Sequence, residues 1–279
     1  LVCLIKEAFI ENHLELNHED GLNPRQYIYM NSFSQYLLVL GLALLPAAGN
    51  FAGALVAEFV AVTDQGRNFA LHAAAGIVFG VVGIELMPRA LEASQPWMVI
   101  VAYLVGGMTY IGVERLFNQF SVRSMADSGN AAWMIYFAVL VDLFSDGMLI
   151  GTSLSISTTL AVLAAIAQVT ADIPEGFAMA ANFKNQQLSR SRRLWLGASL
   201  VLPCVAAASM GFWLLKDAAD IWKFSTLAFT AGILSLAAAE EMMKEAHEAS
   251  EDVTWSAGFF IVGFALFALL SSYFEISDS

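Results

Sequence analysis

The sequence predicts an all-α polytopic membrane protein with eight transmembrane helices. Of its 279 residues, 58% are hydrophobic and only 14% are charged, whereas a soluble domain carries about 25% charged residues. A transmembrane helix needs about 20 predominantly apolar residues. The chain is long enough for about eight such segments and the short polar loops between them.

We expect residues 33–275 to form the eight-helix transmembrane domain. Residues 1–32 should be an N-terminal arm, and residues 276–279 a short C-terminal tail. The arm begins with the amphipathic piece LVCLIKEAFI and continues with a polar run that includes His13 and His18. The simpler interpretation is a surface-lying helix and a solvated arm; the alternative is that the two histidines collect metal ions. Since the chain lacks both a first methionine and a signal-peptide pattern, we expect it to be trimmed or processed.

The expected spans are 35–62, 70–91, 97–113, 131–155, 159–183, 194–215, 224–243 and 253–274. Pro46 and Gly49 are expected to interrupt the first span, and Pro203 lies in the middle of the sixth. The turn between the fourth and fifth spans is so short that these two spans must form an antiparallel hairpin.

The basic residues predict the orientation in the membrane. The densest basic patch lies in the loop 184–193, and cytoplasmic loops carry an excess of Lys and Arg. With this loop in the cytosol and an even number of spans, both termini are extracytoplasmic, and we expect a plasma or inner membrane protein. The net charge of −12 comes largely from the termini and the loop after Met243, so we expect a lipid bilayer environment and no nucleic-acid partner.

The central hairpin carries carboxylates where a membrane protein should have none. Asp142 and Asp146 are four residues apart and share one helix face, while Asp172 and Glu175 are three apart, with Gln168 one turn earlier. Each charge costs about 2.5–3.5 kcal/mol or more at the bilayer centre. No Lys, Arg or His occurs between residues 123 and 184, so we expect a bound divalent cation to supply the positive charge.

All the side-chain donors near these acids are oxygens, which favours Mg²⁺, Ca²⁺ or Mn²⁺ and leaves Fe²⁺ and Zn²⁺ open. Pro174 should free the carbonyl of Thr170 and kink the helix, and Gly147 and Gly151 allow a neighbouring helix to approach at the level of the acids. The alternative is that the acids are protonated and hydrogen-bonded to one another, to Ser145 or to Gln168.

Other acidic residues are less informative. Glu58 and Glu85 lie near span ends, where we expect solvated capping residues; the alternative is that they are ligands on the ion pathway. Glu240 and Glu241 end the seventh span, and His247 follows it. They form either a solvated helix end or a metal exit site.

The two motifs of the hairpin resemble those of a known family. DLFSDGMLIG followed by ADIPEGFAMA is similar to the paired metal-binding helices of the ZIP (zinc/iron-regulated transporter-like) divalent metal transporters, whose fourth and fifth spans usually read H-N-x-x-(D/E)-G and (H/Q)-(N/D/E)-I-P-E-G. The resemblance extends over most of residues 36–275. It implies a bundle of eight spans with both termini outside, and a binuclear transport site to which Asp146, Asp172 and Glu175 contribute.

This chain departs from the family pattern at the nitrogen donors. Asp142 stands where the fourth-span histidine normally is, and Ala171 occupies the fifth-span His/Gln position. Leu202 replaces a sixth-span glutamate, and the second-span position that can offer methionine falls around Ile77. Loss of imidazole favours Mn²⁺ or Fe²⁺ over Zn²⁺, through one site rather than two.

We therefore expect a carrier that moves Zn-, Fe- or Mn-type ions toward the cytosol, and not an enzyme. The kinked spans should move against spans 1, 3 and 6–8. An intramembrane aspartyl protease would need a G-x-G-D loop, and a CDP-alcohol phosphotransferase D-x-x-D-G-x-x-A-R; both motifs are missing. A non-transporting structural or accessory subunit stays open. For a homodimer or a membrane-complex partner, span 3 with Gly106, Gly107 and Tyr110 is the expected contact face.

Overall fold

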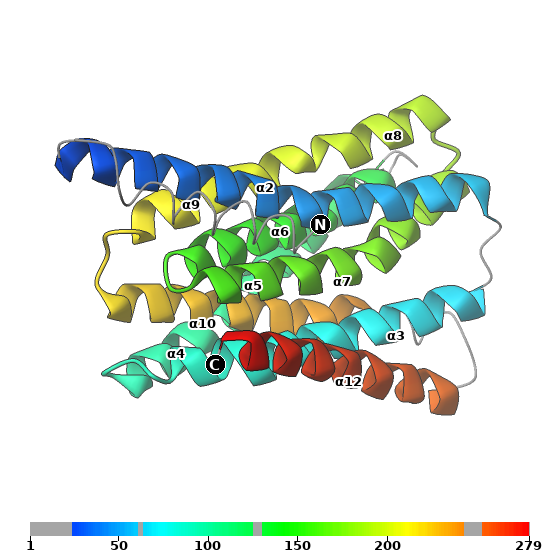
Figure 1. Ribbon diagram of the computed structural model, residues 1–279. Coiled ribbons are helices and arrows are strands. Elements are labelled where there is room, and N and C mark those ends of the chain that lie inside the picture. The colour runs from blue at the N-terminus through cyan, green and yellow to red at the C-terminus, as the bar shows by residue number, and fades with distance from the viewer. Residues whose placement is uncertain (1–23, 61–63, 125–129, 243–252, 279) are drawn as a thin grey trace. The chain divides into compact units, whose positions relative to one another are not determined.

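The computed structural model describes residues 24–60, 64–124, 130–242 and 253–278. The described part contains helices and turns and no strand. Eight of its helices are long and apolar enough to cross a membrane, as the sequence predicts (Figure 1). The protein is therefore an all-helical chain suited to a lipid bilayer.

The helices follow one another with short connections. Their bounds are α2 Pro24–Phe59, α3 Asp64–Gly80, the π-helical turn η1 Val81–Leu86, α4 Met87–Ala90, α5 Pro96–Ser124, α6 Asn130–Leu154, α7 Thr158–Asn185, α8 Arg190–Ser199, α9 Val201–Leu215, α10 Asp220–Ala237, the π-helical turn η2 Ala238–Met242, and α12 Val253–Asp278. Helix α3, turn η1 and α4 together make one span, and α8 with α9 make another.

The proline positions have different consequences in different helices. Helix α2 runs without a break through Pro46 and Gly49, so the predicted interruption of the first span is wrong: a proline removes a single backbone hydrogen bond, which a membrane helix tolerates. The sixth span is divided at Leu200, between α8 and α9. Pro203 follows three residues later and cannot donate a hydrogen bond to Ser199.

The first and last described helices extend beyond the spans expected from the sequence. The chain divides into two units, residues 1–37 and 38–279. In the first unit the described residues are the opening turns of α2, which starts at Pro24 within the segment expected to be an arm; proline is favoured at the start of a helix. His13 and His18 lie outside the described residues. In the second unit, α12 continues to Asp278, through most of the expected tail.

The helices of the second unit pack in two groups. Helix α6 contacts α7 and α9, and α2 contacts α7 through the backbone. In the other group α3 packs on α12, and α5 packs on α10; α3 and α12 run side by side in Figure 1. Spans 1 and 6 therefore lie with the central hairpin, and span 2 lies with spans 3, 7 and 8. The predicted movement of the kinked spans against spans 1, 3 and 6–8 stays a prediction; in the structure spans 1 and 6 contact the hairpin directly.

Glycines allow the helices around the hairpin to touch at backbone distance. A Cβ at Gly176 would overlap the carbonyl of Asn50 on α2, and one at Gly147 would overlap the carbonyl of Cys204 on α9. Gly151 meets Ala208 of α9 in the same way. These contacts fix α2 and α9 against the hairpin at the level of its acidic residues.

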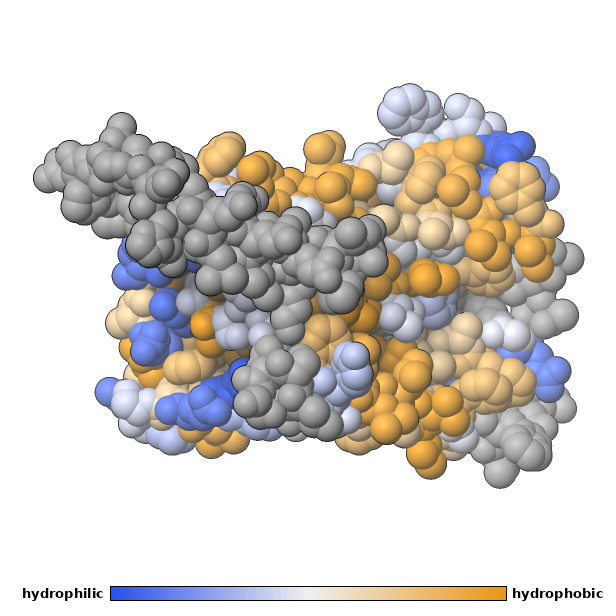
Figure 2. All heavy atoms as spheres, in the orientation of Figure 1, coloured by the Kyte–Doolittle hydropathy of each residue, from blue (hydrophilic) through white to orange (hydrophobic). Residues whose placement is uncertain are grey.

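Apolar side chains cover much of the outer surface, as a bilayer requires. Figure 2 shows hydrophobic residues over much of the described surface on one face, with strongly hydrophilic ones near the two ends of the helices. On α5 the exposed side chains include Trp97, Leu104 and Met108. Gly106 instead meets the carbonyl of Phe229 on α10. Gly106 and Tyr110 therefore do not lie on the exposed face of α5, because α10 of the same chain covers Gly106 and the Tyr110 side chain is buried. The expectation that span 3 contacts a partner stays a prediction.

We expect Gly176→Ala to destabilise the protein by about 1–3 kcal/mol, because the new methyl group must push α2 away from α7. Gly41→Ala is the matched control, since a Cβ at Gly41 on α2 meets nothing within 4 Å. The midpoint of thermal unfolding in detergent measures both. Equal midpoints for the two variants would contradict the close contact at Asn50.

Candidate metal centre

Acidic side chains of α6 and α7 converge inside the bundle. Asp142, Asp146 and Asp172 each offer a carboxylate oxygen, and these three oxygens lie within 4.8 Å of one another. All three residues are buried. The short connection between the two helices, at residues 155–157, holds them antiparallel, so that residues near the middle of each helix meet.

The hydrogen bonds around these aspartates leave several oxygens unmatched. Gln168 donates from Nε2 to one oxygen of Asp146. The second Asp146 oxygen and both oxygens of Asp172 are buried without a hydrogen-bond partner. Carboxylates accept hydrogen bonds and cannot donate them, so two facing aspartates cannot satisfy each other unless one of them is protonated.

No basic side chain of the described residues compensates these charges. The ion pairs formed in this part of the chain involve Glu58, Glu85, Asp217 and Asp220. The three aspartates take part in none of them. An isolated buried charge is unfavourable by far more than a hydrogen bond recovers, so this cluster requires either protons or a cation.

Glu175 extends the cluster toward α2. Its carboxyl group is within hydrogen-bonding reach of Asp142, and Nδ2 of Asn50 lies 3.5 Å from its Oε2 atom. Nothing in the sequence distinguishes Asn50 as a site residue, because a neutral amide in an apolar span adds no charge to it. Its position 125 residues before Glu175 gives no spacing pattern either.

Other candidate donors are already engaged. The Ser145 hydroxyl donates to the carbonyl of Val141 on its own helix at 3.0 Å, and the Cys204 thiol donates to the carbonyl of Ala43 at 3.1 Å. Of the predicted exit site, Glu240 is exposed in η2. The side chain of Glu241 and the whole of His247 lie outside the described residues.

Glu58 and Glu85 are not the solvated capping residues that the sequence suggested. Glu85 is buried in η1, where it pairs with Arg89 at 3.0 Å and accepts a hydrogen bond from Ser271 of α12. At the end of α2, Arg193 donates to both oxygens of Glu58 at 2.7 Å. Each carboxylate is therefore paired with an arginine, Glu85 with Arg89 and Glu58 with Arg193, and is not solvated by water.

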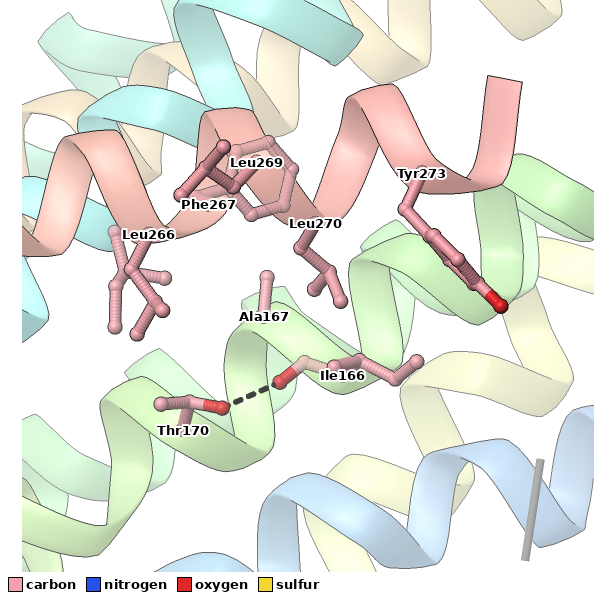
Figure 3. Close-up of a pocket in the computed structure, with 9 residues that line it drawn as sticks. Ile166, Ala167, Thr170, Leu266, Phe267, Leu269, Leu270 and Tyr273 are labelled. Atoms are coloured by element: carbon pink, nitrogen blue, oxygen red, sulfur yellow. Dashed lines mark hydrogen bonds between the residues drawn. The ribbon is translucent and has the colours of Figure 1, made fainter. Parts of the chain in front are cut away.

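An apolar groove of about 410 Å³ lies between α7 and α12. Figure 3 shows Leu266, Leu270 and Tyr273 of α12 facing α7. The Thr170 hydroxyl in its wall donates to the carbonyl of Ile166 at 2.8 Å. The lining is almost entirely apolar, so the groove suits hydrocarbon and not a cation.

A scan against protein-family models found no match, and a search of curated proteins found no similar sequence. The functional interpretation therefore depends on the geometry of the carboxylate cluster.

We expect Glu58→Ala to lower the free energy of unfolding by about 2–3 kcal/mol, because it leaves the partly buried guanidinium of Arg193 without its acceptor. The double variant Glu58→Ala/Arg193→Ala should be less destabilised than the sum of the single changes. Thermal unfolding in detergent measures each variant. Asp217→Ala, which removes an exposed partner of Lys216, should have no measurable effect. Strict additivity of the two single changes would show that the pair does not interact.

Proposed function

We propose that the protein is a divalent metal cation transporter of the ZIP type, which moves an Mn-, Fe- or Zn-type ion through the carboxylate cluster of α6 and α7. The observation that carries this proposal is the buried group Asp142, Asp146 and Asp172, whose oxygens lie within 4.8 Å of one another. Three carboxylates at this spacing can share one cation, and a doubly charged ion would offset most of their mutual repulsion.

The ligand chemistry supports a hard or borderline ion. Aspartate and glutamate oxygens suit Mn²⁺, while imidazole and thiolate donors suit Zn²⁺ better. The amide oxygen of Gln168 is buried without a partner and could add a neutral oxygen ligand. We therefore place Mn²⁺ and Fe²⁺ ahead of Zn²⁺ as transported ions.

The two groups of helices suggest how the ion would cross. All five candidate side chains at the centre belong to α6 and α7, and these helices contact the other group through α3 and α10. Alternating access requires one bundle to move against another around a midplane site. We propose that α2, α6, α7, α8 and α9 move together and carry the ion, as the family resemblance implies for an elevator-like carrier.

The basic loop between α7 and α8 supports an orientation in the membrane, and the proposed movement of ions toward the cytosol is described relative to it. Lys184 donates to the carbonyl of Ala57, and Arg190 lies 3.7 Å from Glu58. Arg192 is exposed. We propose that this loop faces the cytosol, by the excess of Lys and Arg in cytoplasmic loops, and that ions leave past Glu240, Glu241 and His247.

A non-transporting membrane subunit is the second candidate. It is favoured by Gln168, which already donates to Asp146, and by the contact between Asp142 and Glu175. With protons shared among the acids, these contacts would make a stable polar core without any ion. Flux through reconstituted protein separates the two candidates.

We expect the protein in liposomes to take up Mn²⁺, and Asp146→Asn and Asp172→Asn to reduce the initial rate at least tenfold. Even the loss of a group that only hydrogen-bonds a metal ligand costs about 10–100-fold in metal affinity. Asp217→Asn, an exposed acid on the loop after α9, is the control and should retain the parental rate. Fe²⁺ and Zn²⁺ are measured in parallel. No uptake by the parent protein would favour the subunit, and full uptake by both variants would remove the aspartates from the transport site.

A further inference from the structure

We infer that Asn50 of α2 is a cation ligand of this protein, which acts with Glu175 and Asp142 through its side-chain oxygen. The inference rests on the proposed function, and it adds a third helix to the metal site. The family pattern described above places no ligand at this position of the first span.

The backbone holds Asn50 against the acidic residues. Its carbonyl and Cα atoms occupy the space where a Cβ at Gly176 would lie. Gly176 directly follows Glu175, so the side chain of Asn50 reaches that carboxylate from the neighbouring helix. Asn50 is completely buried, with 0% of its surface exposed, and its side chain cannot turn outward to water or lipid.

The amide of Asn50 is poorly satisfied where it lies. Its Oδ1 atom is buried without a hydrogen-bond partner. Its Nδ2 atom is 3.5 Å from Oε2 of Glu175, which is beyond the usual 2.7–3.2 Å of an N–H···O hydrogen bond. A buried amide with an unmet acceptor is unfavourable, so a ligand that accepts electron density from Oδ1 would remove this penalty.

A cation fits this amide better than another protein group would. In the structure Nδ2 faces Glu175. When an ion binds Glu175, rotation of the amide about its Cβ–Cγ bond exchanges the two atoms and turns Oδ1, which has no partner, toward the ion. Two oxygens facing each other repel, and a metal ion between them turns the repulsion into shared coordination. Oxygen ligands from carboxylates and side-chain amides are those that hard divalent ions prefer.

The charge of this set also matches a divalent ion. Asp142 and Glu175 together contribute two negative charges, and Asn50 contributes none. Asp146 and Asp172 lie beside Asp142 and add further negative charge. A neutral ligand at Asn50 therefore limits the excess negative charge around the ion, which favours its release. A third carboxylate in place of Asn50 would hold the ion more tightly and release it more slowly.

Mn²⁺ binding by the purified full-length protein tests the role of Asn50. We expect Asn50→Leu, which keeps the approximate volume and removes the amide, to weaken Mn²⁺ binding about 10–100-fold. Asn50→Asp should bind Mn²⁺ more tightly than the parent and should transport it with a slower turnover. Mn²⁺ electron paramagnetic resonance gives the affinities, and thermal unfolding confirms that each variant is folded.

The matched control is Asn68→Leu, which makes the same change at another buried asparagine, on α3 outside the acidic cluster. It should bind Mn²⁺ as the parent does. If the parent and Asn50→Leu bind equally well while Asp146→Asn does not bind, the inference about Asn50 is overturned and the proposed function stands. If the parent binds no Mn²⁺, Fe²⁺ or Zn²⁺, the transport proposal and the ligand role of Asn50 both fail.

Discussion

The rest of the structure depends on the mutual repulsion of acids in a medium that does not solvate them. Asp142, Asp146 and Asp172 meet where water is excluded, and the described ion pairs elsewhere leave them unmatched. In water such carboxylates would separate; inside a bundle the helices hold them in place. Helix packing must therefore offset the repulsion between the carboxylates when no ion is bound. A doubly charged ion would remove most of that repulsion.

The packing that offsets this repulsion lies on the same turns of α6 and α7 as the acidic residues. Gly147 and Gly151 bring α9 onto α6, and Gly176 brings α2 onto α7. Small residues at helix contacts are the usual means of association in a bilayer, where apolar burial gives no net gain between helices. On both helices a glycine directly follows an acid in sequence, Gly147 after Asp146 and Gly176 after Glu175, so the same turns of α6 and α7 supply the close packing and the polar site.

Much of this fold was predictable because hydropathy alone identifies the membrane spans, and a span in lipid must be helical to hydrogen-bond its own backbone groups. The convergence of Asp142 with Asp146 and of Asp172 with Glu175 also follows from helical periodicity. Residue spacing within a helix does not tell which other helices pack against it. It therefore missed Asn50, and it missed the distant partners Arg193 of Glu58 and Ser271 of Glu85. Arg89, the ion-pair partner of Glu85, is only four residues away, a spacing at which helix side chains meet. The whole of His247 and the side chain of Glu241 lie beyond the described residues, so the metal exit site proposed for them stays a prediction.

The backbone contacts at Gly147, Gly151 and Gly176 imply that substitutions at these glycines and substitutions at the acidic residues have different structural effects. A side chain larger than hydrogen at these positions displaces a neighbouring helix, so the frame accepts almost no variation there. The acidic side chains project from that frame into a space shared by α2, α6 and α7, and an exchange such as Asn for Asp alters the charge there without moving the backbone. A chain built in this way can change the chemistry of its polar centre through single substitutions while its architecture stays the same.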